Sequence, residues 1–159
     1  MDVISIQNQV KVEGPVSLRR PDAILLISCY ELGHQPVGIA LPMGFLKQAG
    51  YAPAALDIAV EEFDAERVKQ AWFIGISVPM HTALRLGIRV AELIRDVNPA
   101  CHLCIFGLYA SLNAEYLLAH VADSVIGGEY ETPLVNLVHA LDRDPLTIRS
   151  VSGVKEDQG

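Results

Sequence analysis

An apolar run that opens into a polar, glycine-containing loop carries the side chains of this chain best placed to do chemistry. Residues 24–27 are apolar, residues 28–35 offer hydroxyl, thiol, carboxylate, imidazole and amide groups, and residues 36–40 begin a helical pattern. In an open α/β sheet, ligands bind at such strand-to-helix junctions. The candidate binding residues of this junction are Cys29, Tyr30, Glu31, Leu32, Gly33, His34, Gln35 and Gly38.

Three later junctions of the same kind add further candidates. The carboxyl ends of parallel strands meet at one edge of a sheet, so we expect all four junctions to form one site. The later candidates are Ser77, Val78, Pro79, Met80, His81 and Thr82, then Gly107, Leu108, Tyr109 and Ala110, and finally Gly127, Gly128, Glu129, Tyr130 and Glu131.

The elements that position these loops alternate between strands and helices. Several of the strands are continuous apolar runs, as expected of parallel strands covered on both faces. The pattern predicts a doubly wound, five-stranded parallel sheet in the flavodoxin-like order 2-1-3-4-5, with helices on both faces. We expect strands at 23–28, 53–58, 72–77, 101–106 and 122–126, and helices at 37–49, 64–70, 82–97, 112–119 and 132–141.

The ends of the chain lack this alternation. We interpret residues 1–21 as an extension, residues 22–141 as the domain, and residues 142–159 as a linker or tail. Within the domain, Asp64, Ser111 and Thr132 are predicted helix caps, and Gly50 is predicted to end a helix.

Composition narrows the classes of partner. The chain has 159 residues, of which 51% are hydrophobic, and a formal charge of −7, with no basic run to neutralise phosphates. We therefore expect no nucleic-acid or membrane partner. The beginning of the chain lacks the features of a signal peptide, and three cysteines do not suggest a disulfide framework, so we expect a cytoplasmic location and reduced thiols.

The sequence lacks the binding motifs of several ligands that are common in this architecture. Gly33 and Gly38 have the glycine spacing of a P-loop, but Ile39 and Ala40 stand where lysine and a hydroxyl are needed. A dinucleotide fold needs a glycine where Gln35 stands. Nucleoside triphosphates and nicotinamide cofactors are therefore disfavoured, as is a phosphorelay receiver, whose acidic residues are missing at the strand ends.

The order and spacing of the four junctions resemble the cobalamin-binding domain of cobalamin-dependent radical-SAM proteins. Residues 36–41 and 46–51 are similar to the first helix of such domains, and residues 75–78 to the third strand. Residues 106–111 stand where that family usually has Gly-Gly-Pro-His-Ala-Thr, and residues 127–131 where it has Arg-Gly-Glu-Gly-Glu. Phe106, Leu108, Tyr109 and Tyr130 depart from the family pattern.

The shape and chemistry of a corrin require a particular kind of binding surface, which these loops could provide. It is a broad disc with an apolar rim and amide side chains, so it needs an open shelf, and its nucleotide tail needs a slot between strand ends. We expect Ser77, Gly107, Gly127 and Gly128 to leave room for that slot. Leu32, Val78, Met80, Leu108 and Tyr109 would cover corrin methyls or the displaced base.

The lower cobalt ligand of methionine-synthase-like domains is missing here. Those domains carry Asp-x-His-x-x-Gly, and alignment on Gly38 puts Gln35 at the histidine and Gly33 at the aspartate position. The resemblance therefore implies base-off cobalamin without a protein metal ligand. His34, one residue out of register, and His81 remain alternative cobalt ligands.

Each of the remaining polar candidates could have a structural role instead of a role in binding. Cys101 and Cys104 have metal-ligand spacing, but alternation along a strand puts them on opposite faces, which favours core positions. Cys29 either approaches the corrin or is a small buried thiol. Glu129 and Glu131 either bind ligand amides or stabilise the start of the last helix.

Radical-SAM chemistry needs a Cys-x-x-x-Cys-x-x-Cys cluster motif, which these 159 residues lack. We name no catalytic residue. The resemblance implies a cobalamin-binding module that holds the cofactor for methyl transfer or electron chemistry beside a radical-SAM domain, in cis or in trans. The alternative is a cofactor-free interaction or sensor domain in which Tyr109 and Tyr130 fill the former slot; a flavin- or nucleotide-binding protein is weaker.

Overall fold

The chain folds around one parallel sheet. The computed structural model describes residues 17–30, 37–144 and 154–156. The strands are β1 (Ile24–Ser28), β2 (Ala54–Asp57), β3 (Phe73–Ser77), β4 (His102–Phe106), β5 (Ser124–Ile126) and β6 (Val154–Glu156). All neighbouring strands pair in parallel.

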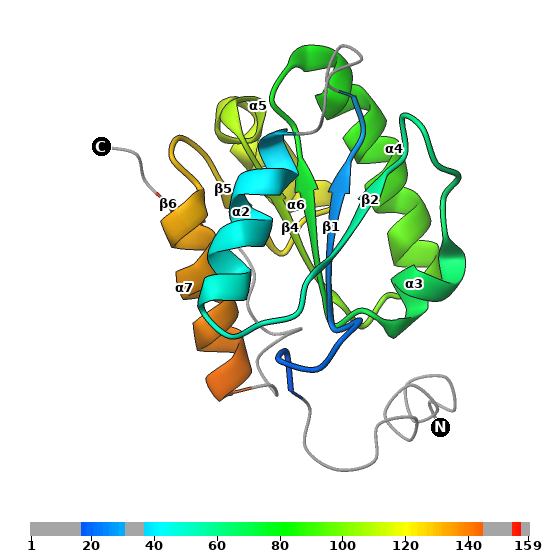
Figure 1. The fold of residues 1–159 in the computed structure, drawn as a ribbon. Coiled ribbons are helices and arrows are strands. Elements are labelled where there is room, and N and C mark those ends of the chain that lie inside the picture. The colour runs from blue at the N-terminus through cyan, green and yellow to red at the C-terminus, as the bar shows by residue number, and fades with distance from the viewer. Residues whose placement is uncertain (1–16, 31–36, 145–153, 157–159) are drawn as a thin grey trace, which may run out of the picture.

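The sheet confirms the predicted flavodoxin-like topology and adds one strand to it. The order is β2-β1-β3-β4-β5-β6, so the first five strands have the predicted order 2-1-3-4-5 (Figure 1). The sixth strand lies inside the predicted tail and pairs with β5. Three residues that include a lysine and a glutamate form no apolar run, and the pattern of hydrophobic residues therefore gave no sign of this strand.

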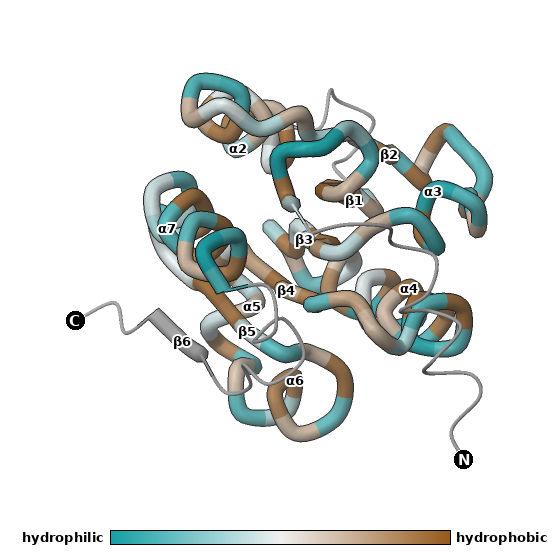
Figure 2. The backbone as a smooth tube through the Cα atoms, turned by 90° about the horizontal axis from the view of Figure 1, so that it is seen from below, coloured by the Kyte–Doolittle hydropathy of each residue, from teal (hydrophilic) through white to brown (hydrophobic). Residues whose placement is uncertain are grey.

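Helices cover both faces of the sheet, as predicted. Figure 2 shows α2 and α7 on one side and α3, α4 and α6 on the other. The helices are α2 (Val37–Gln48), α3 (Ala65–Gln70), α4 (His81–Val97), α5 (Leu108–Leu112), α6 (Ala114–His120) and α7 (Glu131–Arg143). No helix in the described part of the chain has the length and hydropathy needed to cross a membrane.

Alternation along the strands divides the core between the two faces. In β3, Phe73 packs with the α2 and α7 side, whereas Ile74 and Ile76 pack with the α3 and α4 side. Every residue of β1, β3, β4 and β5 is buried. This explains why these strands are mostly apolar, since both faces are covered.

The predicted helix over 112–119 is wrong at its start. Two short helices replace it, and the first begins directly after Gly107, whose φ of +117° allows the abrupt turn out of β4. The side chain of Asn113 donates to the Tyr109 carbonyl oxygen at 2.8 Å and marks the break between the two helices. The region after β4 therefore becomes helical earlier in the chain than hydrophobic spacing indicated.

Two of the four predicted helix ends are confirmed. Asp64 caps α3 by accepting from the Arg67 amide at 3.2 Å, and Gly50 follows α2 with φ +94°. Ser111 is not a cap, because it lies inside α5 and its hydroxyl donates to the Leu108 carbonyl oxygen. Thr132 is not a cap either, because α7 begins one residue earlier and Tyr130 occupies the N-cap position, where its side chain makes no capping hydrogen bond.

The described end of the predicted extension packs on the domain. Leu18 is buried, and its amide donates to Asp142 Oδ1 at 2.8 Å. Arg19 forms an ion pair with Asp142, donates to the Ala49 carbonyl oxygen and lies 4.4 Å from the Tyr51 ring centroid. Residues 1–16 lie outside the described part of the chain.

Candidate functional site

The carboxyl ends of the strands bring one row of side chains together. The register places Asp57 beside Ser28, Ser28 beside Ser77, Ser77 beside Phe106, and Phe106 beside Ile126. Phe106 and Ile126 pack with the α2 and α7 side, and strand alternation places Ser28 and Ser77 on the same face. We call this row the carboxyl-edge row. Its β1 and β3 positions are small and polar, and its β4 and β5 positions are apolar.

Ser77 has the least satisfied polar side chain of this row. The residue is 1% exposed, and its hydroxyl oxygen has no hydrogen-bond partner among the described residues. A buried polar group without a partner costs about 1–3 kcal/mol, so such groups in folded proteins need an explanation. A ligand that supplies a hydrogen bond at the end of β3 is one such explanation.

Backbone hydrogen bonds tie the loops after β3, β4 and β5 to one another. The Val78 amide donates to the Phe106 carbonyl oxygen at 2.8 Å, and the Tyr109 amide donates to the Val78 carbonyl oxygen at 3.2 Å. The Gly107 amide donates to the Ile126 carbonyl oxygen at 2.9 Å. These three loops therefore form a rigid edge rather than independent segments.

Beyond that edge, the loops after β3 and β4 present both polar and apolar side chains. His81 and Tyr109 are in edge-to-face contact, with ring centroids 6.1 Å apart. Leu108 is 57% exposed, and Met80 is half-buried. We call these four residues the edge shelf. An exposed leucine beside two ring side chains suits a ligand with a broad apolar rim.

Two of the three glycines that were expected to leave room for a ligand are packed against protein atoms. A Cβ on Gly107 would lie 3.0 Å from the Val78 carbonyl oxygen, and a Cβ on Gly127 would overlap the side chain of Ser111. Close packing within the fold therefore accounts for both glycines. Gly128 is exposed with φ +63°, which explains glycine there by its backbone conformation.

Phe106 fills the space between the strand ends on the α2 and α7 side. A Cβ on Gly75 would lie 2.9 Å from Leu26 Cδ2 and 3.1 Å from Phe106 Cε1, so the phenyl ring lies against the glycine of the neighbouring strand. The ring of Tyr130 packs on Phe106 at a centroid distance of 4.8 Å. The space beside Gly75 is therefore filled by the Phe106 ring.

Cys29 lies at the carboxyl end of β1 but is covered. It packs in the core on the α3 and α4 side, and burial, with a smaller contribution from the Asp57 carboxylate, raises the pKa of its thiol to about 12. The thiol stays protonated at neutral pH, where a thiolate would be needed to bind cobalt. Of the two interpretations of Cys29, the buried thiol is the one that the described contacts favour.

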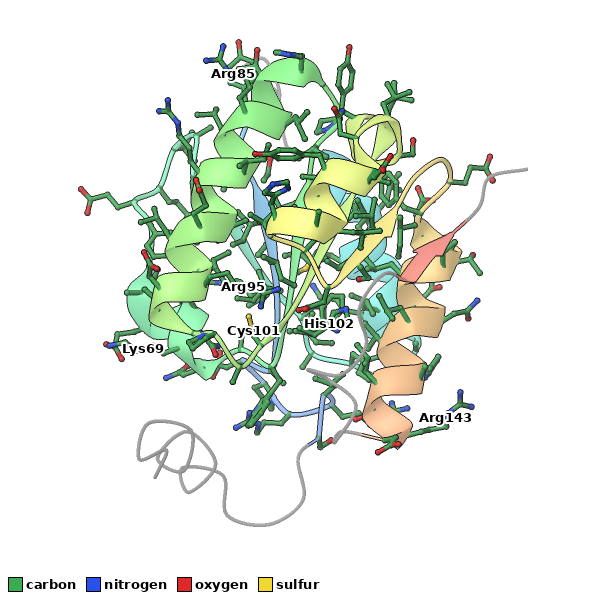
Figure 3. The ribbon with its side chains drawn as sticks, turned by 180° about the vertical axis from the view of Figure 1, so that it is seen from behind. Lys69, Arg85, Arg95, Cys101, His102 and Arg143 are labelled. Carbon is green, nitrogen blue, oxygen red and sulfur yellow. The ribbon has the colours of Figure 1, made fainter. Side chains whose placement is uncertain are left out.

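The Cys-x-x-Cys pair lies away from this edge. Cys101 packs on the α3 and α4 side and Cys104 on the opposite face, as alternation predicted. Figure 3 shows Cys101 and His102 far from Arg85, which marks the start of α4 at the carboxyl edge. His102 is buried, bonded to the Ser124 hydroxyl at 2.9 Å and stacked on Phe73 at 5.5 Å. No group of three potential metal ligands occurs among the described residues.

The predicted site residues divide into three groups. Glu31, Leu32, Gly33, His34 and Gln35 lie outside the described residues, so their role as ligands stays a prediction. Those that are buried within the fold are Cys29, Gly38, Ser77, Val78, Gly107, Ala110 and Gly127. Those that reach the surface of the carboxyl edge wholly or in part are Tyr30, Pro79, Met80, His81, Thr82, Leu108, Tyr109, Gly128, Glu129, Tyr130 and Glu131. Gly38 lies in the first turn of α2.

One residue of the site was missed from the sequence. Ser28, at the end of β1, neighbours Ser77 in the register and is buried on the same face. A serine directly after four apolar strand residues was the available signal, because it repeats the ending of β3.

The topology places this chain among the flavodoxin-like α/β proteins. Comparison with protein-family models gives no match, and comparison with curated proteins gives no significant relative. The function must therefore be argued from the carboxyl edge itself.

Proposed function

We propose that this chain is a corrinoid-binding module that holds cobalamin at the carboxyl edge of its sheet for a radical-SAM partner domain, in cis or in trans. The observation that carries the proposal is the buried, unpartnered hydroxyl of Ser77 at the end of β3. Ligands of open parallel sheets bind outside these strand ends. A corrin carries amide groups around its rim, and one of them would give the hydroxyl the hydrogen bond that it lacks.

The edge shelf has the chemistry that a corrin ring needs. Leu108 and Met80 offer apolar contact to the methyl groups of the rim, and the His81 and Tyr109 rings add flat surface and polar atoms. The hydrogen bonds between the three loops hold the backbone in place at Val78, Gly107 and Tyr109, close to the residues of the edge shelf. Preorganisation of this kind limits the conformational entropy lost on binding.

The residues of this chain bind and orient rather than react. Ser77 would fix the ring by one hydrogen bond, and the edge shelf would exclude water from one face of it. A bound corrinoid would supply the methyl-transfer or electron chemistry. The sequence lacks the cobalt-ligating histidine of methionine-synthase-like domains and the aspartate that orients it, which favours cobalamin in its base-off form. The partner domain would supply the iron–sulfur cluster.

A second candidate function is a cofactor-free interaction or sensor domain. The packing of Phe106 between Gly75 and Tyr130 favours it, because this packing fills space that a ligand would otherwise use. The two functions differ in whether Ser77 acquires a partner from a bound molecule.

The test is an absorption spectrum of the protein after incubation with hydroxocobalamin and gel filtration, repeated after reduction to cob(II)alamin. The proposal predicts a coloured protein with a base-off spectrum. A correctly folded but colourless protein would overturn it in favour of the cofactor-free domain. An imidazole-ligated spectrum would overturn the base-off assignment, and His34→Ala and His81→Ala would then identify the ligand.

A further inference from the structure

The outward sides of α2 and α7 carry no charged side chain along most of their length. Residues 38–46 of α2 and 133–141 of α7 contain no aspartate, glutamate, lysine or arginine, although the chain has 12 basic and 19 acidic residues. The two helices pack against each other on one side of the sheet (Figure 2). The exposed residues of these ranges, which we call the neutral face, are Ala40, Leu41, Gly44, Phe45, Asn136 and Ala140.

The helices on the opposite side of the sheet have a charged exterior. Lys69 of α3 and Arg85 of α4 are labelled on that side in Figure 3. The exposed charged residues of these two helices are Glu66, Lys69, Arg85, Arg89, Glu92 and Asp96. Exposed charges keep a protein in solution and limit contact between its copies. The neutral face lacks this protection.

Two large apolar side chains project from the neutral face. Leu41 is 47% exposed and Phe45 is 42% exposed, and a spacing of four residues places them on the same side of α2. Leu93 of α4 is also 47% exposed, but it lies between exposed Glu92 and Asp96 in the same helix. A single exposed leucine among charges is ordinary, whereas a continuous uncharged patch marks an interaction surface.

Gly44 has no explanation within the described part of the chain. It is exposed in the interior of α2, where glycine stabilises a helix less than alanine does, and a Cβ added there would meet nothing within 4 Å. Ala40 lies one helical turn before it. The two residues form a strip of small side chains beside Leu41 and Phe45. Because side chains at the contact set the distance between packed helices, this strip allows a second helix to approach closely.

We propose that the neutral face is the interface of a homodimer, in which α2 and α7 of two copies pack together about a twofold axis. A twofold interface has to be self-complementary. The neutral face meets this condition, because the projecting side chains and the strip of small residues lie on the same helix. Two copies with a formal charge of −7 each repel one another, and at the neutral face they meet without placing like charges opposite each other.

The size of the neutral face sets the strength of this dimer. At 1.5 Å per residue, α2 and α7 are about 18–20 Å long, and packed helices lie about 8–10 Å apart. A face of two such helices is at the lower end of the size of specific interfaces, which bury about 800 Å² per partner. We therefore expect a dimer that dissociates on dilution. The inference does not rest on corrinoid binding, since no residue of the neutral face is a candidate site residue.

The test is sedimentation velocity at protein concentrations from about 1 μM to 200 μM, which covers dissociation constants in the micromolar range. The wild-type protein should change from monomer to dimer within this range. Leu41→Glu should raise the dissociation constant by about tenfold or more, because it puts a charge among apolar contacts. Leu93→Glu is the matched control, since the leucine is equally exposed, and it should leave the dissociation constant unchanged.

Gly44→Leu tests the close approach of the two helices. Leucine favours the helix more than glycine does, so the monomer should stay folded, as circular dichroism would show. The added side chain should hold the helices apart and weaken the dimer by about tenfold. A wild-type protein that stays monomeric throughout the concentration range would overturn the proposal. A dimer that survives both Leu41→Glu and Gly44→Leu, or that Leu93→Glu weakens as much as Leu41→Glu does, would also overturn it.

Discussion

The two halves of the carboxyl edge differ in how completely protein atoms fill their space and pair their polar groups. On the β4 and β5 half, Phe106 packs against Gly75 and Tyr130, and Gly107 fits against the Val78 backbone. On the β1 and β3 half, two buried serines stand side by side and the hydroxyl of Ser77 lacks a partner among the described residues. Small residues at strand ends therefore do not by themselves mark a ligand site, because some are required by close packing within the fold and others leave a hydrogen bond unmade.

The largest expected effect concerns the closed half, which is the β4 and β5 half. Phe106→Ala should lower the free energy of unfolding by about 3–5 kcal/mol, because it removes a fully buried ring and leaves a cavity. Urea unfolding followed by circular dichroism measures this loss. Phe73→Ala is the matched control and should cost a similar amount. A loss below about 1 kcal/mol for Phe106→Ala would mean that this half of the edge is open.

Gly107→Ala should lower the free energy of unfolding by nearly as much as Phe106→Ala. Its φ of +117° is strained for a residue with a side chain, and the added carbon would lie 3.0 Å from the Val78 carbonyl oxygen. We expect a loss of about 2–3 kcal/mol in unfolding free energy. Gly44→Ala in α2 is the control, because a Cβ added there would meet nothing within 4 Å, and it should be neutral or stabilising by up to about 1 kcal/mol. Equal effects of the two substitutions would refute the tight packing of the closed half.

The two buried serines Ser77 and Ser124 differ in whether their hydroxyl has a partner among the described residues. Ser124→Ala should cost about 1–3 kcal/mol, because it leaves buried His102 without its hydroxyl partner. Ser77→Ala should leave stability unchanged or raise it by up to about 1 kcal/mol, since no hydrogen bond is lost. Thermal unfolding of the two variants checks the difference. If Ser77→Ala were as destabilising as Ser124→Ala, Ser77 would have a partner within the fold.

The last expected effect is absent at neutral pH and is a loss of stability in alkaline solution. The pKa of Cys29 and of Cys104 rises from 9.0 to about 12 in the folded chain, chiefly by burial. Between these values the unfolded state releases protons that the folded state keeps, so stability is unaffected below about pH 9 and falls as pH rises toward 12. Each thiol contributes at most about 1.4 kcal/mol per pH unit. Urea unfolding between about pH 7 and pH 10.5 measures the slope.

Cysteine-to-alanine variants separate the contributions of the two thiols to the pH dependence of stability. Cys29→Ala and Cys104→Ala should each flatten the alkaline slope by a similar amount, although Cys29 lies at the carboxyl edge and Cys104 within β4. A thiol reagent at neutral pH should react with either cysteine of the wild-type protein only after unfolding. Rapid reaction of Cys29 in the folded protein would show that the β1 end is uncovered.

The fold could be predicted because its determinants are local. Uninterrupted apolar runs such as Ile24–Ile27 require strands covered on both faces, and alternation with helices then leaves few topologies. The strand β6 was missed because it depends on an edge supplied by β5 rather than on its own hydrophobicity. The early start of α5 was missed because it depends on the positive φ of Gly107, which hydrophobic spacing does not encode.

The candidate site was harder to predict because the packing and hydrogen bonding of its residues depend on neighbours that are distant in sequence. Gly75 and Phe106 lie on different strands, and only the strand register shows that the ring of one lies against the other. Ser77 was identified by its place at a strand end, but its missing partner is a property of the packed structure. Spacing along the chain predicts which strand ends meet at one edge, whereas packing across that edge determines how much space is left there.

The most direct test of the central claim is a titration of aquocobinamide into the wild-type, Ser77→Ala and Ser124→Ala proteins. If the Ser77 hydroxyl meets a ligand, Ser77→Ala should weaken binding by about fivefold without any loss of stability in the ligand-free protein. Ser124→Ala, at the amino end of β5, should bind normally once folded. Unchanged affinity in Ser77→Ala would contradict the account, because the unpartnered hydroxyl would then have no part in binding.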